Sequence, residues 1–296
     1  MFEIRRIENG IEGTPELELY FSANESQLLH YFEPELGLFA VESPMVIERA
    51  LAAGYELRSF VMIDSLAEEM CQRFEEIIYE YSPQRLESYK NEPVPVYVAD
   101  YETIAGMTGV NITRGVLAIM KRKELPLVSE LLDGCRRVAV FDDVENPTNI
   151  GAMFRSAAAL GIDAVLLVGA SSDPLYRRAS RVSVGTVFQI PWTKLGKHSR
   201  DYKVLGVKRG QADYVDILHS LGYKTAAMAL SDNSIGIDDD RLKKEERLAI
   251  ILGNEGNGLS DEVIERSDYV VKIPMKHNVD SLNVAAASSI VFWELR

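Results

Sequence analysis

The sequence predicts an α/β protein of two domains, with a parallel β-sheet in the C-terminal domain. Three observations predict this fold class. The chain has 296 residues, more than one typical domain. From residue 138 onward, short apolar segments alternate with helical patterns, as they do in βαβ units. Between the two halves, charged residues and Pro126 interrupt the apolar patterning, which indicates a linker. We therefore expect domains at 1–125 and 135–296, joined by a linker at 126–134.

The first half alternates between helical and extended patterns. Pro44 is well placed to start an amphipathic helix, because a proline at the first helical position loses no hydrogen bond. The expected elements are a helix at 43–52, a strand at 58–63, a helix at 64–81, a loop at 82–95, a strand at 95–98, a helix at 101–107 and a strand at 115–120.

The second half contains five apolar segments of strand length, each followed by a polar turn or a helical pattern. They lie at 138–141, 164–168, 225–230, 248–252 and 269–273. The segment 194–213 is polar, basic and contains glycine, so we expect an inserted loop there.

Composition limits the function classes. No apolar run approaches the roughly 20 residues that cross a bilayer, and the chain begins with charged residues, so a cytoplasmic location without membrane contact is expected. Cys71 and Cys135 form neither a metal spacing nor a disulfide framework, and we expect reduced thiols. The net charge of −13 excludes a protein that coats nucleic acid by overall charge, but allows a local basic surface.

The first stretch whose residues could take part in binding or catalysis is NPTNIGAMFRSAAALG at 146–161. We expect Asn149 to cap a helix that follows the first strand of the domain, at the carboxyl edge where open parallel sheets bind ligands. Asn149 and Arg155 would lie on roughly similar sides of this helix. A cap followed by an exposed arginine is the alternative, purely structural interpretation.

The second stretch is LGNEGNGL at 252–259, directly after a predicted strand. Its glycines at 253, 256 and 258 imply positive φ angles or a close approach of the backbone to another group. Their order fits neither a dinucleotide fingerprint nor a P-loop. Glu255 lies inside this turn, and a tight connection without a ligand is the alternative.

The third stretch is KIPMKHNVDSLNVAAA at 272–287. Ser281 is expected to cap a helix that begins with Leu282 and includes three alanines. Ile273, Met275 and Leu282 could form an apolar slot that suits an adenine ring. A packed terminal helix is the alternative.

Taken in this order, the three stretches resemble the motifs of the SpoU family, also called the TrmH family, of ribose 2′-O-methyltransferases. The resemblance covers about residues 135–294. The segments 36–64 and 95–123 more loosely resemble the small RNA-binding domain of the family.

The resemblance implies a deep trefoil knot in the C-terminal domain, a rare exception to unknotted topology, preceded by a smaller domain like ribosomal protein L30e. It implies S-adenosyl-L-methionine as the cofactor, RNA (rRNA or tRNA) as the partner, and a homodimer formed through the knotted domain. The residues expected to bind the cofactor are Leu230, Gly253, Asn254, Gly256, Gly258, Ile273, Met275 and Leu282.

The resemblance also supplies catalytic and RNA-contacting candidates. The catalytic set is Asn149, Arg155, Glu255, Ser281 and Asn283. The arginine has been discussed as a base, but a guanidinium normally stays protonated. We therefore expect Arg155 to bind a phosphate or the developing alkoxide. The basic residues expected to contact RNA are Arg114, Lys121, Arg122, Arg177 and Arg178.

Other function classes fit less well. A protein of the same fold that binds RNA or the cofactor without turnover is the main alternative. A nicotinamide-dependent enzyme would need a different order of glycines. The four histidines, at 30, 198, 219 and 277, are scattered, so no metal site is expected, and His277 is expected at the surface.

Overall fold

The protein is described by a computed structural model that divides into two compact units. The structure describes residues 1–8, 14–21, 27–28, 37–108, 114–196, 201–205, 213–231, 233–254, 256–277 and 281–296. The first unit holds residues 1–124 and 175–189, and the second holds 125–174 and 190–296. The prediction assigned all residues beyond 135 to one domain, whereas 175–189 pack with the first unit.

The first unit contains a five-stranded mixed sheet in the order β1-β4-β3-β5-β2. Its strands are β1 (Phe2–Arg6), β2 (Leu38–Glu42), β3 (Glu56–Ile63), β4 (Val94–Ala99) and β5 (Val116–Lys121). Its α-helices are α1 (Glu18–Phe21), α3 (Pro44–Ala52), α4 (Ala67–Tyr81), α5 (Leu86–Asn91), α6 (Tyr101–Thr108) and α9 (Arg177–Val182). Short 3₁₀ turns lie at Pro15–Leu17, Asp64–Leu66, Pro83–Arg85 and Thr186–Phe188. β1 and β3 run parallel to β4, and β5 runs antiparallel to both β2 and β3.

The helix expected to start at Pro44 is confirmed. The loop expected at 82–95 is wrong, because α5 and a 3₁₀ turn occupy most of it. The polar composition of this segment predicted a loop, but Tyr89 within it is buried. Its hydroxyl accepts a hydrogen bond from the backbone N–H of Leu57 at 2.9 Å. One buried aromatic side chain thus anchors a short helix in an otherwise polar segment.

Residues 175–189 join the first unit through aromatic and ionic contacts. Phe188 packs against Phe39 of β2, with ring centroids 6.0 Å apart. The Glu42 carboxylate, almost fully buried, lies 3.1 Å from Arg181 and 3.7 Å from Arg177 of α9. The buried charge is therefore compensated by two guanidiniums, as a carboxylate removed from water requires.

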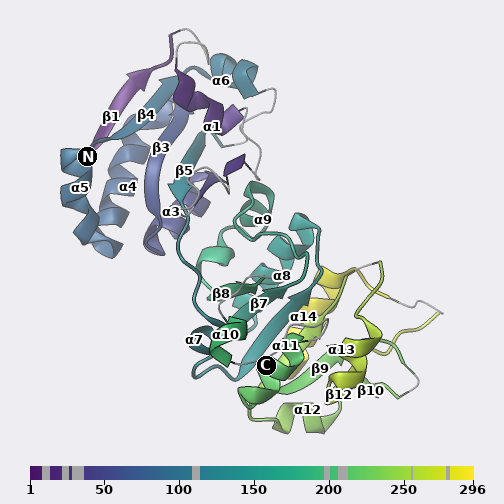
Figure 1. Cartoon of the computed structure of the whole chain (residues 1–296). Helices are drawn as coiled ribbons and strands as arrows, with labels where there is room; N and C mark the ends of the chain where they lie inside the picture. The colour runs from purple at the N-terminus through teal and green to yellow at the C-terminus, as the bar shows by residue number, and fades with distance from the viewer. Residues whose placement is uncertain are drawn as a thin grey trace. The chain divides into compact units, whose positions relative to one another are not determined.

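The second unit contains a seven-stranded sheet in the order β10-β12-β9-β11-β6-β7-β8, in which every strand pair is parallel (Figure 1). Its strands are β6 (Arg137–Asp142), β7 (Ala164–Val168), β8 (Trp192–Leu195), β9 (Lys224–Met228), β10 (Ile235–Gly236), β11 (Leu248–Leu252) and β12 (Tyr269–Lys272). Its helices are α7 (Val128–Leu131), α8 (Pro147–Ala159), α10 (Asp201–Leu205), α11 (Asp213–Ser220), α12 (Asp240–Lys244), α13 (Asp261–Arg266) and α14 (Val284–Leu295). The predicted parallel sheet is confirmed.

Two local expectations in this unit differ from the structure. Within the segment 126–134, expected to be a linker, α7 forms and buries Val128 and Leu131 in the core. The segment 194–213, expected to be a loop, begins in β8, contains α10 and ends at the start of α11, while residues 197–200 and 206–212 lie outside the described residues. Buried apolar residues account for α7, whereas in α10 the buried Asp201 accepts a hydrogen bond from the backbone N–H of Val128 at 2.7 Å.

The order of the strands brings late and early segments together. β11 lies between β9 and β6, both of which precede it in the chain. The last helix, α14, packs along α8, which follows the first strand of this unit (Figure 1). The turn after β6, the glycine-rich turn after β11 and the start of α14 therefore belong to neighbouring elements.

Candidate active site

The first side of the site is the start of α8, at the carboxyl end of β6. Asn146, and not Asn149, caps this helix: its side-chain oxygen accepts a hydrogen bond from the backbone N–H of Thr148 at 2.9 Å. Pro147 occupies the first helical position, where its missing N–H costs nothing. The expected cap at Asn149 is wrong because the proline lies inside the helix, which moves the start three residues earlier.

Asn149 and Asn283 join α8 to α14. Asn149 is buried with 8% of its surface exposed, and its side-chain oxygen accepts a hydrogen bond from the Asn283 amide at 3.2 Å. The Asn283 side-chain oxygen accepts the backbone N–H of Ala285 at 3.0 Å, so Asn283 caps α14. The expected cap at Ser281 is wrong. Asparagine caps as well as serine does, and here one amide both caps its helix and contacts the neighbouring helix.

Arg155 lies on α8, two turns after the cap, and its side chain is exposed. Asn149 on the same helix is buried, so the two side chains do not share one side, contrary to expectation. Six residues correspond to about 240° of helical rotation, which separates the two directions. Within the part of the chain that the structure describes, Arg155 makes no hydrogen bond or ion pair. Its neighbour Ser156 contacts Ser289 of α14, with 2.8 Å between their hydroxyl oxygens.

The second side of the site is the glycine-rich turn after β11. A Cβ at Gly253 would lie 2.7 Å from the backbone of Gly258 and 2.8 Å from Leu259, so no other residue fits without displacing the turn. Gly258 has a φ of 67°, a conformation that favours glycine. The turn is thus closed upon itself, as the three glycines predicted.

Asn254 fastens this turn to the carboxyl end of β6. Its amide donates to the backbone oxygen of Asp143 at 3.0 Å, and its side-chain oxygen accepts the N–H of Gly256 at 2.6 Å. Glu255, expected to be catalytic, lies outside the described residues. The position of its carboxylate relative to Arg155 therefore stays a prediction.

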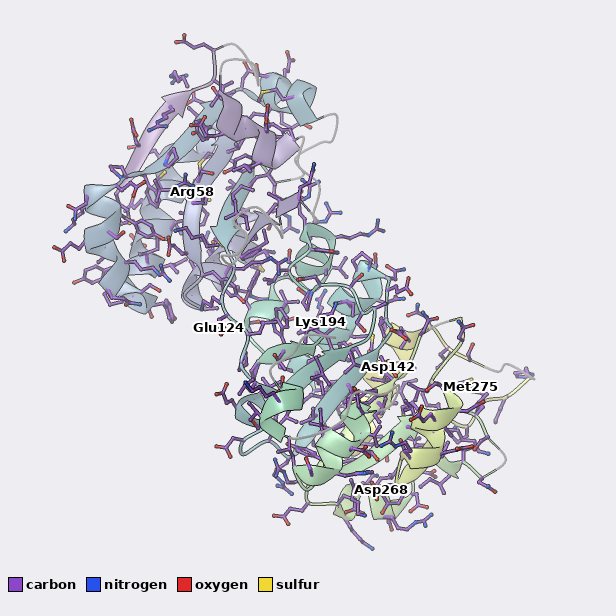
Figure 2. The ribbon with its side chains drawn as sticks, in the orientation of Figure 1. Arg58, Glu124, Asp142, Lys194, Asp268 and Met275 are labelled. Carbon is purple, nitrogen blue, oxygen red and sulfur yellow. The ribbon has the colours of Figure 1, made fainter. Side chains whose placement is uncertain are left out.

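A pocket of about 500 Å³ opens between this turn, the segment after β12 and the start of α14. Ser281 lines it, and so do all eight residues expected to bind a cofactor: Leu230, Gly253, Asn254, Gly256, Gly258, Ile273, Met275 and Leu282. Met275, labelled in Figure 2, belongs to the polar segment between β12 and α14. The structure thus gathers these residues around one cavity, while Asn149, Arg155 and Asn283 are not among the described lining residues.

Sequence reasoning missed two charged lining residues. Asp261 is the first residue of α13 and Lys272 is the last residue of β12. Position alone could have indicated them, because Lys272 is the first residue of the third stretch and Asp261 lies two residues after the second. Charged residues at strand and helix ends are common enough that position is a weak signal.

A half-buried acid, Asp142, lies at the same edge of the sheet, at the end of β6. The Tyr214 hydroxyl of α11 donates a hydrogen bond to the Asp142 carboxylate at 2.7 Å; Asp142 is labelled in Figure 2. Burial raises the pKa of Asp142 above its ordinary value. Burial, reinforced by the neighbouring charge of Asp142, also raises the pKa of Tyr214. The phenol therefore keeps its proton and fixes the end of β6, where the chain turns towards α8.

The five residues expected to contact RNA all belong to the first unit. All five side chains interact with other residues. Arg114 donates to Ser43, Lys121 pairs with Glu56, Arg122 donates to the backbone of Leu38, and Arg177 lies near Glu42. Arg178 is exposed. Contact of these residues with RNA stays a prediction. Sequence reasoning missed that carboxylates already pair with two of them, Lys121 and Arg177.

Two kinds of feature are absent from the described residues. No three His, Cys, Asp or Glu side chains there are grouped so that they could hold a metal ion. No helix there is both long enough and apolar enough to cross a membrane.

The fold and the pocket define a class: an α/β protein with a ligand-sized cavity at the carboxyl edge of a parallel sheet. Residues 136–293 match the family model described as the SpoU rRNA Methylase family. The match covers more than half of the chain, and the chain therefore belongs to this family, as the three motifs predicted.

The proteins similar to this chain include two relatives in sequence and two solved structures. An uncharacterized tRNA/rRNA methyltransferase of Mycobacterium tuberculosis is 35% identical over 204 residues, which is 68% of this chain and 65% of that protein. The match thus spans less than two thirds of that relative. The 23S rRNA (guanosine(2553)-2′-O)-methyltransferase RlmP of Bacillus subtilis is 29% identical over 212 residues, 72% of this chain and 77% of RlmP.

The two structures are similar in fold over nearly the whole chain. An AdoMet-bound rRNA methyltransferase from Sinorhizobium meliloti has a TM-score of 0.75 at 20% identity, covering 99% of this chain and 97% of that one. The SpoU methyltransferase AviRb from Streptomyces viridochromogenes, in complex with AdoMet, has a TM-score of 0.67 at 19% identity, covering 95% and 96%. At these identities the likeness establishes the fold alone.

Proposed function

We propose that this protein transfers a methyl group from S-adenosyl-L-methionine to a ribose 2′-hydroxyl of a structured rRNA or tRNA. One observation carries the proposal: the residues expected to hold the cofactor line a single pocket in the part of the chain that matches the family, although they come from Leu230 and from the separate stretches 252–259 and 272–287. Membership of an rRNA methylase family and the 2′-O activity in the name of RlmP support the choice of reaction.

The pocket suits the cofactor in size and in chemistry. Its volume of about 500 Å³ lies in the range of small-molecule sites. Ile273, Met275 and Leu282 supply apolar surface for an adenine, and the turn at Gly253 supplies backbone polar groups beside it. When bound, S-adenosylmethionine supplies a methyl group activated by the adjacent sulfonium.

The protein must then place the ribose hydroxyl in line and stabilise the charge that develops as its proton leaves. Arg155 carries a permanent positive charge and, with no partner among the described residues, is available to a phosphate or an alkoxide. The Asn149–Asn283 hydrogen bond holds the start of α14, and with it Ser281, in a fixed position beside the pocket. Glu255 and Ser281 orient the sugar or Arg155 through hydrogen bonds.

We also propose a homodimer that pairs through α14 in a knotted C-terminal domain. Ile290 and Trp293 are 41% and 57% exposed, and exposed Ala286 lies one turn before Ile290 on the same side of α14. An apolar stripe on a terminal helix fits a second copy of the same surface, as in two-fold symmetric pairs. Pairing there would bring Arg155 of one subunit to the pocket of the other. The position of β11 between two earlier strands supports the knot that the resemblance implies.

The proposal is tested by incubating the purified protein with methyl-labelled S-adenosylmethionine and separate pools of rRNA and tRNA. The label is expected on ribose 2′-oxygens of one pool after digestion to nucleosides. Arg155→Ala is the control, expected to bind the cofactor normally and to transfer little. Cofactor and RNA binding without any transfer would instead support the non-catalytic alternative, and label on bases alone would refute the reaction proposed.

A further inference from the structure

The first unit contains a cavity of about 860 Å³ that the proposed methyl-transfer site does not use. Side chains from three adjacent strands line it: Arg5 of β1, Tyr97 of β4 and Ser59 of β3. Arg5 pairs with Tyr97 in the parallel register of β1 and β4. Tyr20 of α1 covers the same face of the sheet, with its hydroxyl 2.6 Å from the Ser59 hydroxyl. The cavity therefore lies over the sheet, beside α1.

An irregularity in β3 directs Arg58 into this cavity. Leu57 pairs with Met120 and Ser59 pairs with Ile119, so Arg58 is an extra residue without a partner on β5. Consecutive side chains of a regular strand point to opposite faces, yet Arg58 and Ser59 both line the cavity. Such bulges re-aim side chains and often occur near functional sites.

The Arg58 guanidinium is not committed elsewhere. Arg58, labelled in Figure 2, is exposed and makes no hydrogen bond or ion pair with another residue that the structure describes. Arg5, by contrast, pairs with Glu3 at 2.6 Å. The bulge thus presents one free guanidinium to whatever enters the cavity.

Tyr97 supplies a second uncommitted group. The residue is 2% exposed, and its hydroxyl has no hydrogen-bond partner among the described residues. Burial raises the pKa of Tyr97, so the phenol stays protonated and can donate. The negative charge of Glu16 raises this pKa further, while Arg5 and Arg58 oppose the shift. A buried polar group without a partner is costly, so a bound ligand that accepts from it would be stabilising.

Carboxylates around the cavity restrict which chemical groups can bind in it. Glu16 and Glu18 line it from the first helical turns, and Glu92 lines it from the end of α5. These carboxylates would repel a phosphate. The group that enters the cavity must therefore be uncharged, with hydrogen-bond acceptors for a guanidinium on one edge and donors for a carboxylate on another, and any phosphate attached to it must stay outside.

Guanine has this pattern. Its O6 and N7 accept a two-pronged hydrogen bond from arginine, and its N1–H and N2 amino group are donors on the adjoining edge. Adenine places an amino donor where guanine has O6, so it cannot satisfy the same guanidinium. Pro93 and Pro95 add apolar surface against which a planar base can lie.

We propose that this cavity binds a guanine base, with Arg58 on its acceptor edge and Glu16 or Glu18 on its donor edge. The base belongs either to an unpaired nucleotide of RNA or to a free guanine nucleotide. The RNA source rests on the proposed function, whereas the guanine site itself does not.

The test measures the affinity of the full-length protein for the labelled pentaribonucleotides UUGUU, UUAUU and UUUUU by fluorescence anisotropy, with unlabelled GTP and ATP as competitors. UUGUU is expected to bind about tenfold more tightly than UUAUU, which is the discrimination of one two-pronged arginine contact. Arg58→Gln should abolish this preference. Tyr97→Phe keeps the shape of the ring and should weaken guanine binding. Arg73→Gln, an exposed arginine of α4 outside the cavity, is the matched control and should change nothing.

The outcomes distinguish a guanine of RNA from a free guanine nucleotide, and they test the guanine site separately from methyl transfer. A preference for UUGUU that requires Arg58 assigns the base to RNA. A preference for GTP over ATP that requires Arg58, without binding of the pentamers, assigns it to a free nucleotide. Either result supports the site. No guanine preference in any arm, or a preference that survives Arg58→Gln, would overturn it. Failure of the proposed methyl transfer would appear separately, as wild-type protein that transfers no methyl group from S-adenosylmethionine to RNA.

Discussion

The amide of Asn283 donates a hydrogen bond to the side-chain oxygen of Asn149 over 3.2 Å, although 134 residues separate the two in the chain. Because Asn283 also caps α14, this bond fixes the start of the last helix against the helix that follows β6. Two residues selected as catalytic candidates thus form one contact. Their first role is to position the pocket wall that contains Ser281 and Leu282.

This contact predicts a difference between two substitutions at position 283. Asn283→Asp keeps an oxygen that accepts the N–H of Ala285 but loses the donor to Asn149, so stability should be nearly unchanged while methyl transfer falls. Asn283→Ala removes the cap as well and should cost about 1 kcal/mol of unfolding free energy. Chemical denaturation and single-turnover assays measure the two effects. Equal activity of Asn283→Asp and wild type would show that the contact has no part in transfer.

The close packing around Gly253 leads to a second prediction. The backbone of Gly258 and the side chain of Leu259 fill the space that a Cβ at this position would need. Gly253→Ala places a methyl group 2.7 Å from the backbone of Gly258 and must displace the turn. We expect S-adenosylmethionine affinity to fall at least about tenfold, or ~1.4 kcal/mol, by calorimetry. Gly196→Ala, where a Cβ would meet nothing within 4 Å, is the matched control in the same unit. A Gly253→Ala protein with unchanged affinity would mean that the cofactor does not contact this turn.

In the proposed homodimer, the exposed position of Arg155 predicts that this side chain acts on the pocket of the other subunit. Arg155→Ala and Gly253→Val should each be inactive alone. After subunit exchange, mixed dimers would have one doubly altered site and one intact site, so about one quarter of wild-type activity should return. Ile290→Glu in both chains should prevent pairing and with it the recovery. No recovery in dimers shown to be mixed would place Arg155 in the site of its own subunit.

Asp142 predicts a pH dependence of stability. Burial raises its pKa above the ordinary 3.8, so its contribution to stability is complete below that pH and is lost as pH rises through the higher, folded-state pKa. Asp142→Asn remains neutral and can still accept from the Tyr214 hydroxyl. Its melting temperature relative to wild type should therefore increase between pH 4 and pH 7. A constant difference over this range would contradict the burial of an ionising carboxylate.

The sequence was sufficient to predict the elements that have strong apolar periodicity. The parallel sheet, the helix at Pro44 and the residues around the pocket follow from alternation, proline position and motif order. The two misplaced caps have different causes. Pro147 fits the first position of α8, so Asn146 caps that helix. Asn283 and Ser281 are comparable capping residues, and the contact of Asn283 with Asn149 on α8 favours Asn283.

Other features depend on tertiary contacts that no local pattern contains. Buried Tyr89 turns a polar segment into α5, and Glu42 compensates Arg177 across more than a hundred residues of sequence. The bulge at Arg58 is similarly invisible, because it exists only in the register between β3 and β5. Local propensity predicts elements, whereas register and ion pairing depend on the assembled unit.

The central claim is ribose methylation, and the most direct measurement is a map of 2′-O-methyl groups in total RNA from cells with and without this protein. The account predicts that one or a few ribose methylations disappear and return with the wild-type gene but not with Arg155→Ala. Identical maps under conditions where the protein is made, or restoration by Arg155→Ala at the wild-type level, would contradict it.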